Sequence, residues 1–159
     1  HRGQQAVSPL TLRAEPAKAE RLLLVQQGAY AAEAELMGFE GIPPLHETLD
    51  ELLEAEHQHW LGRFEAATLV GGLAWEDDGG AGLAISRLVV APSTWRRGHA
   101  TALLDAFDEL AGTRAVTTST GSANTPALAL YARRGFVVSG EEEIAPGVGL
   151  TRLLRPGRL

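Results

Sequence analysis

Residues 88–104 read LVVAPSTWRRGHATALL and are the most informative part of the 159-residue chain. The apolar residues that open this stretch are typical of a buried strand, and Pro92 ends it. A short basic loop follows, and from Gly98 onward small residues begin a helix that has Leu103 and Leu104 on its apolar side. The stretch therefore predicts a strand, a tight loop and a helix in succession.

The loop and the first helical turn have the composition of an anion site. The N–H groups at a helix N-terminus have no partner within the helix, and the helix dipole attracts negative charge to them. Gly98 and Ala100 leave the backbone open to close approach, and Arg96 and Arg97 add positive charge. A pyrophosphate would fit there. A strand-to-helix turn with solvated arginines is the alternative that this segment alone leaves open.

Residues 124–136 read NTPALALYARRGF and predict a second short helix. Thr125 is a candidate N-cap, Pro126 suits the first turn, and Gly135 ends the helix. Tyr131 lies on the apolar face of this helix. It is either a core aromatic residue or a phenol placed for acid–base chemistry, and the spacing alone does not separate these two roles.

The chain before these segments predicts one strand and two helices. Residues 10–14 alternate apolar and polar as in a half-buried strand, and Pro16 suits the first turn of a helix. That helix ends at Gly38, and Thr48 with Glu51 forms a capping box for the second helix. The apolar stripe of the first helix has spacings of three and four, at Leu22, Val25, Ala29, Ala32 and Leu36.

The remaining segments predict a sheet of mostly antiparallel strands. Turn residues at 77–80 and at Pro146-Gly147 join two pairs of strands. With no linker or internal repeat, we expect one domain over residues 10–156, and we interpret residues 1–9 as an N-terminal tail or tag remnant. The strand candidates are residues 60–65, 67–75, 82–90, 115–119, 136–144 and 150–154.

The composition limits the classes of partner. There are 20 acidic against 14 basic residues, and the formal net charge of −6 disfavours nucleic acid and anionic membrane surfaces as partners. The chain has no cysteine, which excludes disulfides and thiolate metal sites and favours a cytoplasmic location. No apolar run approaches the roughly 20 residues that span a bilayer. No metal is expected, because His46, His57 and His59 lack the His-Glu-x-x-His spacing.

Taken together, the two quoted segments resemble the GNAT acyltransferase superfamily. The first has a strand that ends in Val-x-Pro and then an Arg/Gln-x-x-Gly-x-Gly/Ala loop, here residues 95–100. Trp95 departs from this pattern, since it stands where the family has Arg or Gln. The second has Asn124, then Ala127, Leu-Tyr and Gly-Phe in the family's spacing. The resemblance implies an α+β fold whose mixed, mostly antiparallel sheet splays between the fourth and fifth strands and is flanked by about four helices.

The resemblance also implies that the chain binds acetyl-CoA as a cosubstrate. The pantetheine arm would lie in the opening of the sheet against Leu88, Val89 and Val90, with the Val90 N–H donating to the thioester oxygen. Tyr131 would protonate the departing CoA thiolate. The other implied contacts of CoA are Arg96, Arg97, Gly98, His99, Ala100 and Thr101 around the pyrophosphate, and Asn124 beside the arm.

By the same resemblance the protein is an N-acetyltransferase that passes the acetyl group directly to a primary amine of a small molecule or a protein, and it forms a homodimer. A non-catalytic module that binds CoA or acyl-CoA is the alternative. The general base stays open, because Ser86 and Arg87 stand where many relatives have a Glu on the fourth strand. Other candidates, acting through water, are Glu76, Asp77, Glu143 and His59.

Overall fold

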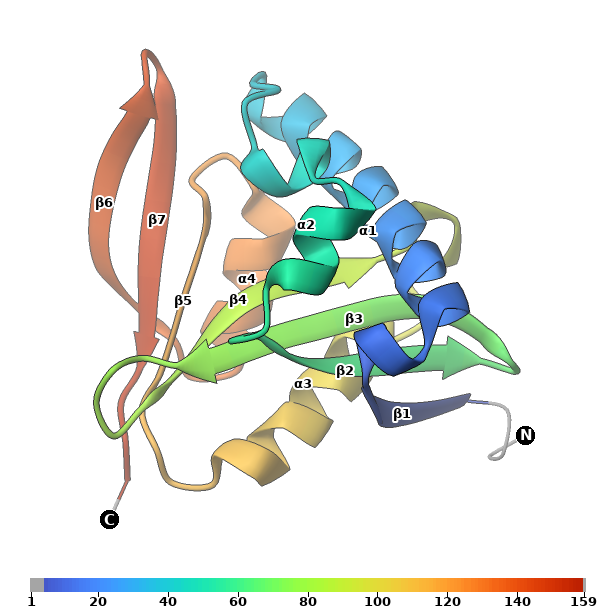
Figure 1. Cartoon of the computed structure of the whole chain (residues 1–159). Coiled ribbons are helices and arrows are strands. Elements are labelled where there is room, and N and C mark those ends of the chain that lie inside the picture. The colour runs from blue at the N-terminus through green and yellow to red at the C-terminus, as the bar shows by residue number, and fades with distance from the viewer. Residues whose placement is uncertain (1–4, 159) are drawn as a thin grey trace.

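The computed structural model describes residues 5–158, which form one mixed sheet flanked by helices (Figure 1). The strands are β1 (Gln5–Leu10), β2 (His59–Glu65), β3 (Thr68–Asp77), β4 (Leu83–Val90), β5 (Val116–Gly121), β6 (Val137–Ala145) and β7 (Val148–Arg155). The α-helices are α1 (Pro16–Met37), α2 (Leu49–Glu54), α3 (His99–Ala111) and α4 (Thr125–Arg133), and short 3₁₀ turns are η2 (Leu12–Ala14), η3 (Pro43–His46) and η4 (Pro92–Thr94).

The strands follow the spatial order β1-β2-β3-β4-β5-β7-β6. Every junction is antiparallel except the parallel one between β4 and β5. A parallel junction needs a crossover connection, and α3 supplies it by leading from β4 back to the start of β5. This arrangement confirms the predicted α+β fold with a mixed, mostly antiparallel sheet.

The first strand lies earlier in the chain than the sequence predicts. β1 ends at Leu10, and residues 12–14, expected as part of this strand, form the turn η2. Residues 5–9 therefore belong to the sheet rather than to a tail, while residues 1–4 of the predicted tail lie outside the described residues. The alternation of apolar and polar residues over 10–14 predicted a strand because Leu10 and Leu12 are both buried. Leu10 ends β1, however, whereas Leu12 lies in the turn η2.

Local capping signals give most helix boundaries correctly and one of them wrongly. Thr48 Oγ1 accepts the Glu51 N–H at 3.2 Å and the Glu51 carboxylate accepts the Thr48 N–H at 2.9 Å, which confirms the capping box of α2. At α4 the N-cap is Asn124 and not Thr125. The Asn124 side-chain oxygen accepts the Ala127 N–H at 3.3 Å, whereas Thr125 is already the first residue of the helix.

The helices bury apolar residues on both faces of the sheet. On one face, Leu22 and Val25 of α1 pack with Leu52 of α2 against β2, β3 and β4. Gly72 of β3 permits this close packing, because a Cβ atom there would lie 2.8 Å from the side chain of Leu22. On the other face, α3 and α4 cover the sheet (Figure 1).

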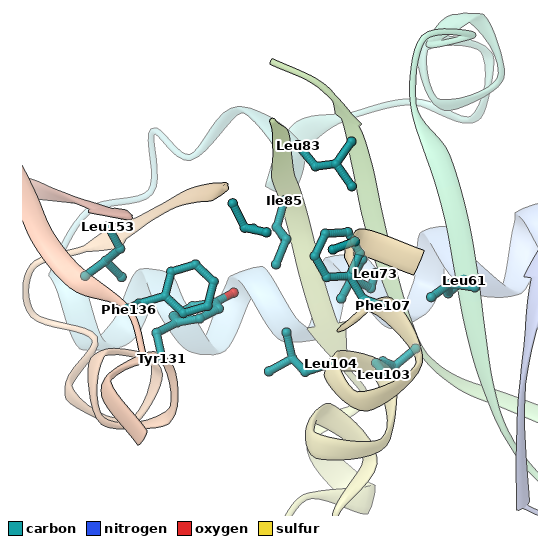
Figure 2. Close-up of a cluster of buried hydrophobic side chains, with 12 residues drawn as sticks. Leu61, Leu73, Leu83, Ile85, Leu103, Leu104, Phe107, Tyr131, Phe136 and Leu153 are labelled. Carbon is teal, nitrogen blue, oxygen red and sulfur yellow. The ribbon is translucent and has the colours of Figure 1, made fainter. Parts of the chain in front are cut away.

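The core on this second face is drawn in Figure 2. Leu103, Leu104 and Phe107 of α3 are completely or almost completely buried against β2, β3 and β4. The same core continues to Tyr131 of α4 and Phe136, whose rings meet edge to face with centroids 5.2 Å apart. Tyr131 is therefore fixed by core packing as well as by its helix.

An ionic network ties α4 to the helix and the strand beside it. Arg134 follows α4 and donates to Asp105 and Asp108 of α3, at 2.8 Å each. Arg155 of β7 also contacts Asp108, at 2.8 Å. Charged hydrogen bonds of this kind are stronger than neutral ones, so the network fixes α4 relative to α3.

The sheet opens between β4 and β5. These strands pair only at Leu83 with Val116 and at Ala84 with Thr117. Beyond this point, Ser86 is an extra residue in the pairing of β4 with β3, because Ala74 lies opposite Arg87 and the next residue of β3 lies opposite Ile85. A β-bulge bends its strand and interrupts pairing, which gives a physical reason for the separation of the two strands. The splay predicted between the fourth and fifth strands is confirmed.

Candidate functional site

The opening in the sheet leads into a cavity of about 780 Å³. Its wall is formed by α1 and the loop that follows it, the second half of β4, the first turn of α3, β5, α4 and the β6–β7 hairpin. Cavities of this size are typical of sites that bury a small-molecule ligand. Of the residues predicted to form the site, Leu88, Val89, Val90, Arg96, Gly98, His99, Ala100, Thr101, Asn124 and Tyr131 all line it.

The first turn of α3 presents its backbone N–H groups without a side-chain partner. The N-cap is Gly98, which has a φ of 79° that glycine adopts without strain, and among the described residues no side chain caps this turn. The N–H groups of His99, Ala100 and Thr101 therefore belong to an open helix N-terminus at the cavity wall. Arg96 precedes them with a φ of 66°, a left-handed conformation that is uncommon outside glycine.

At the end of β4, alternate backbone groups point toward β3 and toward the opening. The Ala91 N–H donates to Val70 of β3 at 2.8 Å, so by alternation along the strand the peptide groups of Val90 face the cavity. The Val90 carbonyl accepts the indole N–H of Trp95 at 2.9 Å. Trp95 thus lies beside the open strand edge, with about half of its surface exposed.

The side chains of Arg97 and His99 point toward β2. Arg97 is not among the residues that line the cavity, and its guanidinium contacts Glu65 at 2.7 Å. Arg63 donates to Nδ1 of His99 at 3.0 Å, and Nε2 of His99 lies 3.0 Å from the Glu65 carboxylate. Since Nδ1 accepts, the proton is assigned to Nε2, which donates to Glu65. His99 therefore offers the cavity only its backbone.

Tyr131 projects from α4 into the inner part of the cavity. Figure 2 shows its hydroxyl pointing away from Leu153 toward the side of the sheet that carries Ile85. Only 4% of the residue is exposed. Burial raises the pKa of Tyr131 to about 12, although a hydrogen bond with Thr118 acts in the opposite direction. The phenol is therefore protonated at neutral pH.

Comparison with known proteins agrees with this geometry. The profile of the acetyltransferase (GNAT) family matches residues 27–136, which is more than half of the chain. The chain belongs to this family. Within the match lie the splayed strands, the open turn of α3 and Tyr131.

Solved acetyltransferases share the fold over nearly their whole length. A PaiA N-acetyltransferase from Thermoplasma acidophilum, determined in complex with coenzyme A, has a TM-score of 0.74 and 15% identity, with 97% of this chain and 99% of that one covered. A protein from Corynebacterium glutamicum described as histone acetyltransferase HPA2 and related acetyltransferase has a TM-score of 0.76 and 17% identity, with 98% of each chain covered.

A curated relative is more similar in sequence but much longer. The UPF0157 protein YqkA of Bacillus subtilis is 34% identical over 134 residues, which are 84% of this chain. The aligned part is 38% of that protein, so the chain spans less than two fifths of the relative's length.

The candidate site also contains residues that sequence patterns did not single out. Glu33 and Tyr30 of α1 line the cavity. Glu33 lies four residues after Ala29 and three before Leu36, within reach of the apolar stripe. A charged residue beside the apolar stripe of a helix was the signal that could have identified it.

The position where many family members have a glutamate base holds an ion pair instead. Arg87 contacts the carboxylate of Glu47, with Nη2 to Oε2 at 2.8 Å, and donates to Gln26 at 2.9 Å. Ser86 donates to a backbone carbonyl of β3 at 3.3 Å. The candidates Glu76, Asp77, Glu143 and His59 are all described, and none of them is among the residues that line the cavity.

Within residues 5–158, no helix combines the length and apolar character needed to cross a membrane. In the same range, no three or more His, Asp or Glu side chains gather as a metal site would require.

Proposed function

We propose that this acetyltransferase is an N-acetyltransferase that moves an acetyl group from acetyl-CoA to a primary amine in one direct step. One observation carries the proposal. A single cavity is bounded by the open first turn of α3, the separated edge of β4 and the buried phenol of Tyr131. These are an anion site, a set of backbone hydrogen-bonding groups and a proton donor.

The residues present fit coenzyme A. The N–H groups at the start of α3 and the guanidinium of Arg96 suit a pyrophosphate, and Gly98 has open space in the direction a side chain would take. The backbone edge at Val90 suits the amide groups of a pantetheine arm. When bound, acetyl-CoA supplies an acetyl group held as a thioester, which an amine nitrogen can attack.

Tyr131 is proposed as the general acid. Because its pKa lies at about 12, the phenol keeps its proton at neutral pH and can donate it to the sulfur atom that leaves. Core packing against Phe136 holds the ring, so little ordering is needed when substrates bind. The Val90 N–H is the candidate donor to the thioester oxygen.

The test combines a thiol-release assay with a panel of primary amines and the variant Tyr131→Phe. We expect thiol release that depends on the amine, and a fall in kcat of about 10²-fold or more in the variant, which is the usual contribution of a general acid. Thermal stabilisation by CoA should be the same in both proteins, because the variant keeps the pyrophosphate turn.

The outcomes separate the rival functions. Stabilisation by CoA without thiol release for any amine would favour a non-catalytic CoA-binding module and overturn the enzymatic proposal. An unchanged kcat in Tyr131→Phe would remove Tyr131 from the reaction while leaving the transferase function in place.

A further inference from the structure

On the side of α1 and the β6–β7 hairpin, the cavity wall is largely apolar. The apolar residues on this side include Leu36, Met37, Ile42, Pro43, Ile144 and Leu150. They come from three separate segments, namely the end of α1, the loop that follows it and the two strands of the hairpin. A wall of this kind suits the apolar part of a ligand and leaves additional polar groups of a ligand without partners.

One carboxylate stands in this wall. Glu33 is the only acidic side chain among the described residues that line the cavity. The cationic Arg87 on the same side is nearly buried and already paired with Glu47. Arg96 belongs to the pyrophosphate turn, and His99 is held by side chains of β2. On the α1 side of the cavity, Glu33 is therefore the charged side chain that is available to bind a ligand.

The Glu33 carboxylate lies beside the loop between β5 and α4, near the backbone of Gly121 and the side chain of Asn124, whose oxygen caps α4. Burial raises the pKa of Glu33, and hydrogen bonding by Gly121 and Asn124 acts in the opposite direction. A carboxylate with a raised pKa is a better proton acceptor near neutral pH than an exposed one.

The other titratable groups around Glu33 are two tyrosines and one ion pair. Tyr30 lies on α1 one turn before it, and Tyr131 faces it from α4; burial raises the pKa of both phenols. From β4, Arg87 faces the same region together with its partner Glu47. The residues that the β6–β7 hairpin contributes to the wall do not titrate. Glu33 and Tyr131 thus form a pair in which one group accepts and the other donates a proton.

We propose that Glu33 binds the ammonium group of the acceptor and removes its proton, and that the acceptor is a monoamine with an apolar body. This inference rests on the proposed acetyl transfer and names the acceptor class for it. An apolar body would contact Leu36, Met37 and Ile144 while the nitrogen lies at Glu33. A second ammonium group, as in a polyamine, would have no further carboxylate in the wall, and the carboxylate of an amino acid would be repelled by Glu33.

The protons and bonds balance as follows. Glu33 takes one proton from the ammonium group and later releases it to solvent. The neutral nitrogen forms a bond with the acetyl carbon, and the bond from that carbon to sulfur breaks. The sulfur receives the proton of Tyr131, and the nitrogen's second surplus proton restores the phenol. The net products are an N-acetyl amide, CoA with a free thiol, and one proton.

The first test measures binding without turnover. Hexylamine is titrated by calorimetry into the wild-type protein, Glu33→Gln and the matched control Glu35→Gln, which alters an exposed residue of the same helix. We expect the Kd for hexylamine to rise by roughly tenfold or more in Glu33→Gln, as for loss of a charged hydrogen bond. In Glu35→Gln the Kd should be unchanged. Equal affinity in all three proteins would overturn the binding role of Glu33.

The second test separates proton removal from binding. With hexylamine, kcat of Glu33→Gln should fall by about 10²-fold or more. With 2,2,2-trifluoroethylamine, an amine that is already neutral at the assay pH, the ratio of wild-type to variant kcat should be much smaller. The same ratio for both amines would overturn the role of Glu33 as a base. The KM for acetyl-CoA and the thermal stability serve to show that the variant is folded.

The third test addresses the acceptor class with the wild-type protein. Hexylamine and 2-phenylethylamine should have kcat/KM values at least tenfold above those of spermidine and leucine, because one pocket contact of this kind commonly changes kcat/KM by that factor or more. A preference for spermidine or leucine would overturn the acceptor class while leaving acetyl transfer intact. If no amine releases thiol, it is the proposed function that fails.

Discussion

The variant Glu47→Ala tests the buried ion pair that takes the place of a glutamate base on β4. Arg87 and Glu47 have only 10% and 12% of their side chains exposed. Removing the carboxylate leaves the guanidinium with Gln26 as its remaining side-chain hydrogen-bond acceptor, at 2.9 Å, and with little access to water. Breaking a buried pair from one side costs about 3–5 kcal/mol, which for a chain of this length lowers Tm by roughly 6–20 °C.

The assay is urea denaturation, with thermal unfolding as a second measurement. Glu20→Ala, which alters an exposed glutamate of α1, is the control and should change the free energy of unfolding by less than about 0.5 kcal/mol. The double variant Arg87→Met/Glu47→Leu should recover most of the loss, because replacing both partners by apolar residues is often neutral. A cost below about 1 kcal/mol for Glu47→Ala, typical of an exposed pair, would refute the reasoning.

The same pair has a pH dependence of known sign. Burial raises the pKa of Glu47, but hydrogen bonds from Arg87 and Gln26 outweigh this effect, so its pKa lies below the ordinary value for glutamate. A lowered pKa in the folded state means that the stabilisation is present above the unfolded-state pKa and is lost as the pH falls through the folded-state pKa. The difference in unfolding free energy between wild type and Glu47→Ala should therefore shrink on acidification.

Two further substitutions test the phosphate turn and the core. Thr101→Glu should stabilise the free protein by about 0.3–1 kcal/mol, since a negative charge in a first helical turn is favourable, and should weaken CoA binding at least tenfold by repelling the pyrophosphate. Thr101→Gln is the neutral control, and equal CoA affinity of the two variants in a thermal-shift titration would argue against this turn as the phosphate site. Phe107→Ala should cost about 3–5 kcal/mol of unfolding free energy in urea denaturation, because the ring is fully buried. Leu110→Ala on the exposed side of the same helix should cost under about 1 kcal/mol, and a similar loss in both would contradict the packing of α3.

Features that depend on neighbours in the chain could be predicted from the sequence. The capping box at Thr48 and the glycine at the start of α3 act through backbone geometry over a few residues, and both were located correctly. The splay between β4 and β5 followed from the family resemblance rather than from any pattern in these strands. Its physical cause is the extra residue Ser86, which is visible only once β3 and β4 are paired.

Side-chain directions that depend on distant residues could not be predicted. Arg97 and His99 were expected at the pyrophosphate because they lie in the motif, but Glu65 of β2 holds both side chains on another side of the turn. The oxygen of Asn124 caps α4 and its amide lies near Glu33, while the expected contact of Asn124 with the CoA arm stays a prediction. Glu33 could be identified as a site residue only once the structure showed which face of α1 lines the cavity. The contacts of Arg97 and His99 with Glu65, and the place of Glu33 in the cavity wall, depend on residues far apart in the chain, so no local pattern encodes them.

The extra residue at Ser86 changes which face of the sheet the odd-numbered residues of β4 occupy. In a regular strand, residues of the same parity share one face, so Arg87 would point with Leu83 and Ile85 into the apolar core beneath α3. After the bulge the parity is reversed, and Arg87 and Val89 instead face α1, where Gln26 and Glu47 lie. The inserted residue thus keeps the guanidinium of Arg87 out of the apolar core and places it beside α1, at the wall of the cavity.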